Sequence, residues 1–442
     1  MNPRADAGVR QQTRRRPPLP PTVDPVNCRI HRGTNEIGAT CIELEADGSH
    51  IVLDLGLPLS MAAGPGVPLP RVEGILARKP DPTLLGVLVS HPHPDHFGLL
   101  PQVADHVPVY IGATAGRILR EAAFFSPMGL DIEWAGHFEH RKPFRLGPFT
   151  ITPYLNDHSG FDAYGFLVEA GGRRLYYSGD FRGHGRKKAI FHQLLRKPPE
   201  GVHVLLLEGT HIRDEADGTE QGPSEMDVEA DLIDTFRDTE GMALVIFSAQ
   251  NIDRLVSVYR AVIQSGRDMV IDLYAATMAR ATGRDTIPQA EWDRVRVYLP
   301  RAQRARVIRE RAFERTSAVR PQRIFPEELV ARRSELVMLF RASMCREIEA
   351  AGCLDGAKAV WSLWPGYLQE PSGERLQRWL HDRGIPMVVH HSSGHAYIPD
   401  WVRLAEAVSP DRIVPLHSTA ADRFDEFLPR VERRQDQELW KV

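Results

Sequence analysis

Residues 90–98 read SHPHPDHFG and place three histidines and one aspartate within six consecutive positions. The segment before them, LLGVLV at 84–89, is continuously apolar and has the length of a buried strand. The segment after them, FGLLPQV, is typical of the start of a short helix. The polar cluster therefore stands at the carboxyl end of a strand, where α/β sheets commonly bind ligands. Such a cluster predicts a metal site if further ligands follow in the chain.

The spacing within the cluster favours two metals. Residues two apart on an extended segment point to the same side, so His91 and His93 can bind one metal. Pro92 and Pro94, each directly after one of these histidines, disfavour helix and hold the segment extended. Asp95 and His96 follow where the chain turns, and they can face a second metal nearby. Imidazole and carboxylate ligands without thiolate suit Zn²⁺, with Mn²⁺ or Fe²⁺ as alternatives.

Length and composition limit the class of protein. A chain of 442 residues can hold two domains, or one domain with a large insertion. The formal net charge of -3 predicts no polyanionic partner from overall charge alone. The four cysteines form no CxxC pair, which favours a reducing cytosol. We find no signal segment and no apolar run near the roughly 20 residues of a membrane helix, so we expect a cytoplasmic, soluble protein without a membrane partner.

The first part of the chain predicts a disordered tail followed by sheets. Residues 1–26 are rich in Arg and Pro, and the arginines at 14–16 could contact a phosphate backbone, although a solvated tail is the favoured interpretation. From Asn27 onward, short strands alternate with turns such as EADGSH (45–50) and EAGGRR (169–174). A helical segment at 114–125 interrupts the strands, so we expect sheets covered by helices.

A second pattern begins after the buried strand VHVLLLEGT (202–210). Ser224 and Asp227 form a capping box for a helix, and strands at 243–247 and 269–274 then alternate with helices, which predicts a parallel α/β unit. Histidine-bearing strand ends return in the last part of the chain, at PMVVH and RIVPLH.

Further ligand candidates stand at the ends of apolar strands in the same way. They are Asp54, His158, Asp180 and His417. Each alone is explained better by a hydrogen-bonded structural role. Together with HxHxDH they favour a metal centre that includes residues from several strands.

HPHPDH, followed in order by His158, Asp180 and His417, resembles the metallo-β-lactamase fold, an αββα sandwich with a metal pair at one sheet edge. In simple members of that fold the last histidine follows the bridging aspartate closely. Here 237 residues separate them (417 − 180). This gap resembles the β-CASP subgroup of nucleic-acid-processing nucleases, which includes ribonuclease J and the polyadenylation endonuclease.

Short matches over residues 27–442 support this resemblance, and the first of them resembles the start of ribonuclease J-like proteins. They comprise the opening RGTNEIGATCIEL, Glu208 in LLLEGT, FSAQNIDRL at 247–255, His395 in SSGHA and His417 in PLHS. The resemblance implies a sandwich domain in two parts, 27–208 and 385–442, with a β-CASP α/β domain inserted at 209–384. We expect no counterpart of the separate C-terminal domain of typical ribonuclease J, which leaves open both a homodimer and the balance of endo- and exonuclease activity.

By motif position, the resemblance implies two Zn²⁺ per chain, with Mn²⁺ as an alternative. The first would bind His91, His93, His158 and Asp180, and the second would bind Asp95, His96, Asp180 and His417. Asp180 would bridge ions about 3.5–4 Å apart, and a hydroxide between them would attack phosphorus. Asp54 would orient the ligands from outside the first coordination shell.

The resemblance also implies the catalytic and substrate-binding residues. His395 would protonate the leaving 3′ oxygen, with Glu208 keeping it protonated; such a donor contributes about 10²–10⁴ in rate. Ser392, Ser393 and Gly394 could bind a substrate phosphate, or form an ordinary turn. His395 is followed by Ala-Tyr, so a phosphate-binding serine directly after it is not expected.

The Arg-rich segment 294–346 has a local surplus of nine positive charges. Helical spacing would place Arg304, Arg311 and Arg315 on one stripe, and Ala305, Ile308 and Ala312 on another. We expect the apolar stripe to pack on the inserted domain and the arginines to face a single strand. A solvated face, partly neutralised by the acidic segment 208–240, is the alternative.

The aromatic side chains of WSLWPGYLQEP (361–371) are Trp361, Trp364 and Tyr367. Core packing is the expected role of all three. Stacking on nucleic-acid bases is the alternative.

The leading hypothesis is a zinc-dependent ribonuclease that hydrolyses single-stranded RNA as a 5′–3′ exonuclease, an endonuclease or both. His417 favours RNA, because the DNA-repair nucleases of the Artemis type carry an apolar residue at that motif. The alternatives are a DNA exonuclease of the same mechanism and a catalytically silent RNA-binding subunit. The intact ligand set argues against the silent subunit, and the inserted domain argues against a small-ester hydrolase.

Overall fold

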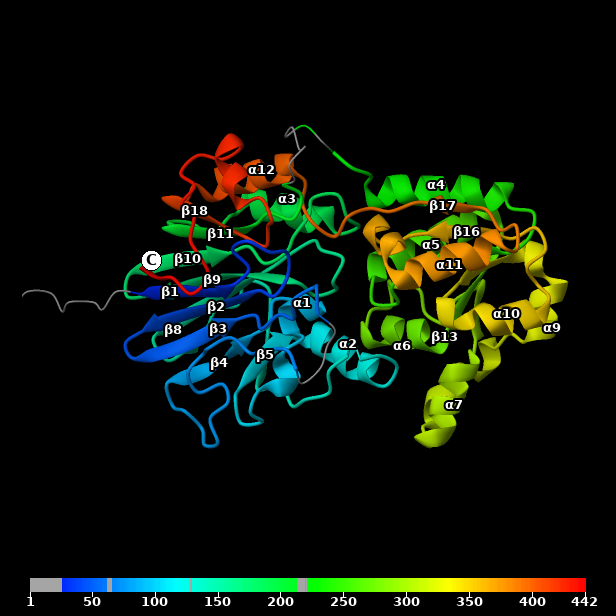
Figure 1. Ribbon diagram of the computed structural model, residues 1–442, viewed down its shortest axis with the longest axis horizontal. Coiled ribbons are helices and arrows are strands. Elements are labelled where there is room, and N and C mark those ends of the chain that lie inside the picture. The colour runs from blue at the N-terminus through cyan, green and yellow to red at the C-terminus, as the bar shows by residue number, and fades with distance from the viewer. Residues whose placement is uncertain (1–25, 62–65, 128, 213–218, 220) are drawn as a thin grey trace, which may run out of the picture.

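The computed structural model describes residues 26–61, 66–127, 129–212, 219 and 221–442, arranged in two lobes (Figure 1). The predicted tail at 1–26, including the arginines at 14–16, lies outside the described residues apart from Val26.

The first lobe, here called the sandwich, consists of two facing sheets. Among the described residues, one sheet has the order β19 (Leu439–Lys441), β1 (Asn27–Arg32), β2 (Cys41–Ala46), β3 (Ser49–Leu53), β4 (Leu84–Leu88), β5 (Val109–Gly112), β6 (Gly136–Phe138). The other has the order β18 (Arg412–Leu416), β11 (Val204–Glu208), β10 (Arg173–Tyr177), β9 (Tyr164–Ala170), β8 (Phe149–Leu155), β7 (Phe144–Leu146). Apolar side chains from both sheets, such as Leu44 and Phe166, form one core between them.

Helices cover both outer faces of the sandwich. The first sheet packs against α1 (Pro94–Phe97) and α2 (Ala113–Ala123), through residues such as Leu119. The second packs against α3 (Lys188–Arg196) and α12 (Ile398–Val408), where Trp401 is fully buried. This arrangement confirms the predicted αββα sandwich.

The predicted hairpin turns of the sandwich are also present. Asp47 and Gly48, between β2 and β3, have φ of +47° and +68°. Gly171 and Gly172, between β9 and β10, have φ of +52° and +71°. Two consecutive residues with positive φ form the tight turn whose twist matches that of paired strands.

The second lobe, here called the third-sheet lobe, contains a parallel sheet. Within the described ranges its order is β14 (Val295–Tyr298), β13 (Asp268–Asp272), β15 (Leu336–Leu339), β12 (Ala243–Ile246), β16 (Lys358–Trp361), β17 (Met387–Val389). One face packs against α4 (Glu225–Asp238), α5 (Ile252–Ser265) and α6 (Leu273–Ala281). The other packs against α9 (Pro326–Ala331), α10 (Cys345–Ala351) and α11 (Pro371–His381). The predicted parallel α/β pattern is therefore correct.

Short 3₁₀ helices complete the described secondary structure. They are η1 (Leu100–Gln102), η2 (Arg320–Gln322), η3 (Arg333–Glu335), η4 (Ala342–Met344), η5 (Pro365–Gln369) and η6 (Ala421–Glu426).

Two predicted boundaries need correction. The chain was expected to return to the sandwich at 385, but β17 pairs with β16 and so belongs to the third sheet. The strand predicted at 269–274 ends at Asp272, because the Asp272 side chain accepts a hydrogen bond from the backbone N–H of Ala275 and begins α6. The predicted capping box of α4 is present, with Ser224 and Asp227 bonded reciprocally.

The two connections to the third-sheet lobe leave from neighbouring strands. The connection out follows β11, and the connection back precedes α12 and β18. β11 and β18 pair in parallel, with Val204 opposite Arg412, although the whole third-sheet lobe separates them in sequence.

The predicted arginine stripe is wrong. Helix α7 (Arg301–Arg309) ends before Arg311, whose φ of +55° interrupts it, and a separate helix α8 (Phe313–Ser317) follows. The side chain of α7 that enters the core is Val307, whereas Ile308 is 64% exposed. The Arg304, Arg311 and Arg315 side chains therefore do not share one helical face.

Candidate metal centre

The predicted ligands gather at the carboxyl ends of the sandwich strands. His91 and His93 follow β4, and Asp95 and His96 lie in α1 directly after them. His158, Asp180 and His417 follow β8, β10 and β18. The carboxyl ends of strands from both sheets thus meet at one edge of the sandwich. The proposed ligands lie at this edge.

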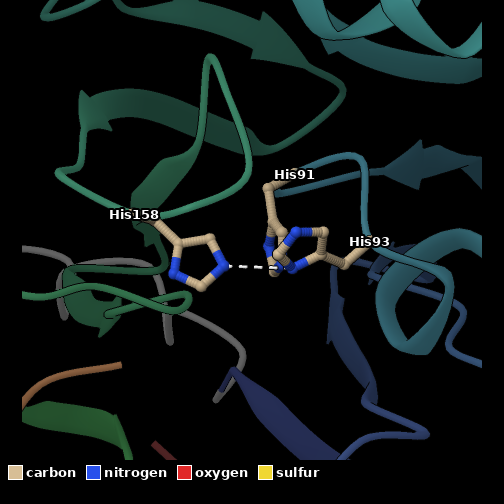
Figure 2. Close-up of side chains that lie close together, drawn as sticks. All are labelled: His91, His93 and His158. Atoms are coloured by element: carbon tan, nitrogen blue, oxygen red, sulfur yellow. Dashed lines mark hydrogen bonds between the residues drawn. The ribbon is translucent and has the colours of Figure 1, made fainter. Parts of the chain in front are cut away.

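Three histidines form the first cluster. The ligand atoms of His91, His93 and His158 lie within 4.8 Å of one another. Figure 2 shows the three imidazoles turned toward a common point, with His158 Nε2 3.1 Å from His93 Nδ1. This grouping brings together residues 65 positions apart in the chain.

A second cluster lies beside the first. The ligand atoms of Asp95, His96, Asp180 and His417 also lie within 4.8 Å of one another. The Oδ2 atom of Asp180 is 3.2 Å from His96 Nε2 and 3.6 Å from His91 Nε2, one nitrogen from each cluster. Asp180 therefore lies between the two clusters, within reach of both.

Hydrogen bonds determine which ring nitrogen of each histidine remains available to bind a metal. In four of the histidines Nδ1 is held by a neighbour: His91 by Ser90 Oγ (3.0 Å), His96 by Asp54 (2.8 Å), His158 by the Gly394 carbonyl (2.6 Å) and His417 by Thr210 Oγ1 (2.9 Å). A proton on Nδ1 leaves Nε2 as the ligand, which is the usual arrangement around a bound metal.

The donor set fits divalent cations. His91 Nε2, His96 Nε2 and both carboxylate oxygens of Asp180 are buried without a hydrogen-bond partner among the described residues. Unpaired buried polar atoms are costly, so their convergence indicates a group that pairs with all of them. Imidazoles and carboxylates without thiolate are suited to zinc or manganese.

The electrostatics of the two clusters differ. Burial lowers the pKa of His91 and His158 well below the usual value and that of His93 to about 4, so these imidazoles are neutral, as metal binding requires. Burial would also lower the pKa of His96, but the carboxylates of Asp180, Asp54 and Asp95 raise it well above its usual value. The second cluster therefore favours a positive charge.

Asp54 anchors the centre from outside the two clusters. Its carboxylate accepts hydrogen bonds from the Ser90 N–H (2.6 Å), the Ser90 hydroxyl (2.7 Å), the Tyr177 hydroxyl (2.8 Å) and His96 Nδ1. Asp54 and His417 have φ of +59° and +53°, which non-glycine residues rarely adopt. Such strained residues persist where surrounding contacts hold them, often at functional sites.

His395 and Glu208 meet at a threonine that the sequence analysis did not single out. The Thr210 hydroxyl lies 2.9 Å from Glu208 Oε2, 3.1 Å from His395 Nδ1 and 2.9 Å from His417 Nδ1. A hydroxyl donates one hydrogen bond and accepts two, so it can donate to Glu208 and accept from both imidazoles. Burial would lower the pKa of His395, but Asp180 and Glu208 raise it to about 9.

Hydrogen bonds from other residues of the protein hold the segment 392–394 in place. The Ser393 carbonyl accepts hydrogen bonds from Arg182 (2.7 Å) and His184 (3.1 Å), and the Gly394 carbonyl accepts one from His158. Ser392 is buried. A phosphate-binding role for Ser392, Ser393 and Gly394 remains a prediction.

A buried charge network joins the two lobes beside this segment. Arg182 pairs with Asp253 (2.6 Å), Asp157 (3.4 Å) and Glu225 (3.5 Å), and Glu225 also pairs with Arg254 (3.0 Å). Asp157 and Arg182 belong to the sandwich, whereas the other three belong to the third-sheet lobe. The arginine in SGDFR was visible in the sequence, but its partners lie 25 or more residues away, so sequence spacing gave no signal for them.

Of the three arginines proposed to face RNA, one has a structural partner. Arg315 pairs with Glu121 in α2, and its guanidinium lies 4.5 Å from the centroid of the Phe124 ring. Arg304 and Arg311 are exposed. Arg315 therefore helps to pack α8 against the sandwich.

Comparisons with known proteins show what this chain is similar to. The family described as "Beta-lactamase superfamily domain" matches residues 63–253. Ribonuclease J of Mycobacterium tuberculosis is 26% identical over 265 residues, covering 57% of this chain and 45% of that protein. Ribonuclease J of Corynebacterium glutamicum is 23% identical over 433 residues, covering 90% of this chain and 55% of that protein. This chain thus spans about half the length of these relatives.

A solved structure supports the fold. A protein of unknown function from Enterococcus faecalis is 18% identical, with a TM-score of 0.71 over 95% of this chain and 100% of that one. In the part of the chain that the structure describes, none of the helices has the length and apolar character needed to span a membrane.

Proposed function

We propose that this chain, which is similar to ribonuclease J proteins and has a metallo-β-lactamase fold, is a zinc-dependent ribonuclease that acts on single-stranded RNA. The observation that carries this proposal is the convergence of two ligand clusters on Asp180, next to the histidine pair His395 and His417 and facing a second α/β lobe. The third-sheet lobe corresponds to the β-CASP domain, and residues His390–His395 form the segment that connects it back to the sandwich.

The two metals, when bound, would supply an activated water and stabilise the charge that develops on the phosphate. The residues of the chain prepare the site for this. Asp54, Ser90, Thr210 and the Gly394 carbonyl fix the orientation of the ligand imidazoles. These contacts favour the tautomer with the proton on Nδ1, so Nε2 of each imidazole is available before any metal binds.

His395 is the proposed general acid. Its Nδ1 is occupied by the Thr210 hydroxyl, which leaves Nε2 to donate a proton to the leaving 3′ oxygen. Glu208 lies 3.6 Å from the same ring, and its charge favours the protonated imidazole. A positioned acid of this kind contributes about 10²–10⁴ in rate.

The decisive experiment measures metal content and cleavage together. Protein of known metal content is incubated with a single-stranded RNA, and with a DNA of the same sequence, each carrying a labelled 5′-monophosphate. The control variants are the double substitution Asp95→Ala, His96→Ala, which removes two ligands, and His381→Ala, whose side chain is 90% exposed.

We expect about two metals per chain and cleavage of RNA by the wild type and His381→Ala, with cleavage lost in the double variant. Released mononucleotide would identify a 5′-exonuclease, and internal fragments an endonuclease. Equal cleavage of DNA would contradict RNA specificity. Absence of cleavage by metal-loaded protein would contradict the nuclease and favour a silent RNA-binding subunit.

A further inference from the structure

The aromatic segment 361–371 divides into a buried and an exposed part. Trp361 is 4% exposed and packs in the core of the third-sheet lobe, as expected. Trp364 and Tyr367 are 50% and 42% exposed, so core packing, predicted for all three, is wrong for these two. The physical reason is that β16 ends at Trp361 and the chain then leaves the sheet as a loop and the short helix η5.

Local contacts hold the two exposed rings in place. Their centroids are 5.3 Å apart and the ring planes are perpendicular, at 89°. A Cβ atom added to Gly366 would lie 2.2 Å from Cη2 of Trp364, so one part of the indole rests directly on the Gly366 backbone. The Trp361 indole N–H donates to the Trp364 carbonyl (3.3 Å), which ties the loop to the core. The exposed surface is therefore ordered before any ligand arrives.

Sheet topology places this pair at the edge that faces the metal centre. β16 runs parallel to β12, with Trp361 opposite Ile246, so the loops that follow the two strands leave the sheet at one edge. The loop after β12 reaches the sandwich, where Asn251 bridges to Gly160. A Cβ atom at Gly160 would lie 3.0 Å from the His91 ring. The carboxyl edge of a parallel sheet is also where ligands commonly bind.

Two further observations connect the pair to the site. The Trp361 carbonyl accepts a hydrogen bond from the His390 N–H (3.0 Å), and the chain reaches His395 five residues later. Burial raises the pKa of the Tyr367 phenol, and the negative charge of the Asp95 carboxylate raises it further. Tyr367 thus lies within electrostatic reach of a ligand residue of the other lobe.

We propose that Trp364 and Tyr367 form a stacking platform that binds an unpaired nucleobase beside the scissile phosphate. This inference rests on the proposed function. It adds that the protein recognises a nucleobase of the RNA as well as the scissile phosphate. Aromatic faces bind bases with little regard to sequence, and each base contributes a substantial part of the affinity. A base in a duplex has no free face, so the platform selects single strands.

The test uses metal-loaded protein and a single-stranded RNA with phosphorothioate linkages, which slow cleavage. One base is replaced by fluorescent 2-aminopurine, at each position in turn, and the dissociation constant and the quenching are measured. The variants are Trp364→Ala, Tyr367→Ala and the conservative Trp364→Phe. Phe325→Ala is the matched control, because Phe325 is 46% exposed and immediately precedes α9, on the side of its lobe away from α1 (Figure 1).

We expect each alanine variant to weaken single-strand binding by about 5- to 150-fold and to remove the quenching at one position. Trp364→Phe should retain most of the affinity, and Phe325→Ala and duplex binding should be unchanged. Metal content and far-UV circular dichroism must match the wild type, which excludes misfolding.

An abasic nucleotide at the quenched position gives a second test. It should weaken binding to the wild type but cause no further loss in Trp364→Ala. Wild-type protein that binds and cleaves RNA while both alanine variants bind equally well would overturn the platform and leave the nuclease intact. Wild-type protein that neither binds nor cleaves RNA would overturn the proposed function itself.

Discussion

Thr210 illustrates how one small side chain can serve both metal binding and acid catalysis. Its hydroxyl contacts Nδ1 of His417, a proposed metal ligand, and Nδ1 of His395, the proposed acid. The same oxygen contacts Glu208, and the Thr210 backbone N–H also donates to that carboxylate (3.0 Å). Since one hydroxyl defines the tautomer of both imidazoles, its loss should affect two functions together.

We therefore predict that Thr210→Val, which keeps the shape but removes the hydroxyl, lowers kcat/KM for RNA cleavage by about 10- to 100-fold. Thr210→Ser should retain most of the activity, because it keeps the hydroxyl. Steady-state kinetics with metal analysis in parallel measure the effect. Equal activity of the valine and serine variants would show that the hydroxyl has no role.

At the scale of elements, α1 is only four residues long, yet it carries Asp95 and His96. It is held by backbone hydrogen bonds from the loop after β3, where the Leu55 N–H donates to the His96 carbonyl (2.8 Å) and the Leu57 N–H to the Pro94 carbonyl (2.9 Å). A Cβ atom at Gly56 would lie 1.7 Å from the Asp95 carbonyl oxygen. Glycine is required here because the loop approaches the helix backbone so closely.

Gly56→Ala should accordingly displace α1 and reduce the bound metal from about two ions to one or none per chain. The first cluster lies outside α1, whereas Asp95 and His96 of the second lie within it, so the first should be affected less than the second. Gly66→Ala is the matched control, since a Cβ atom there meets nothing within 4 Å among the described residues. Full metal occupancy in Gly56→Ala, measured by elemental analysis, would contradict this account.

The sequence predicted the elements well where hydrophobic period and local turn chemistry determine them. The strands ending near His158, Asp180 and His417 follow from apolar runs, and so the ligand positions could be predicted. The assignment of β17 could not be predicted, because pairing with β16 is a non-local contact. The end of α7 likewise depends on the backbone conformation of Arg311, which no side-chain periodicity encodes.

At the scale of the whole molecule, buried ions hold the two lobes together. Asp157, Glu225 and Asp253 offer three negative charges to the cations of Arg182, Arg254 and Lys187. The arginines are fully buried, so removal of one partner leaves an uncompensated charge in a medium of low polarity. Burial would raise the pKa of Glu225, but Arg254 and Arg182 lower it to about 2.

This pKa gives a prediction with a defined sign. A carboxyl group whose pKa falls from 4.5 to about 2 on folding stabilises the folded state above pH 4.5, and the contribution is lost as the pH falls toward 2. Glu225→Gln should lower the free energy of unfolding by about 3–5 kcal/mol at pH 7. Urea titrations at pH 7 and pH 3 should show the difference shrinking at the lower pH.

The control for that experiment is Glu406→Gln, an exposed carboxyl of α12, which should leave stability unchanged at both pH values. A difference between wild type and Glu225→Gln that stays constant with pH would mean that the ionisation of Glu225 does not contribute to the stability of the interface.

The pairing of β11 with β18 also determines the order in which the site is completed during protein synthesis. During synthesis the ribosome releases every proposed ligand up to Asp180 before it begins the third-sheet lobe, and His417 emerges only after that lobe is complete. Contacts between such distant segments form late, because a long loop must close first. A nascent chain therefore carries the first cluster throughout synthesis of the third-sheet lobe without the histidine that completes the second. The proposed activity would therefore not precede synthesis of the third-sheet lobe.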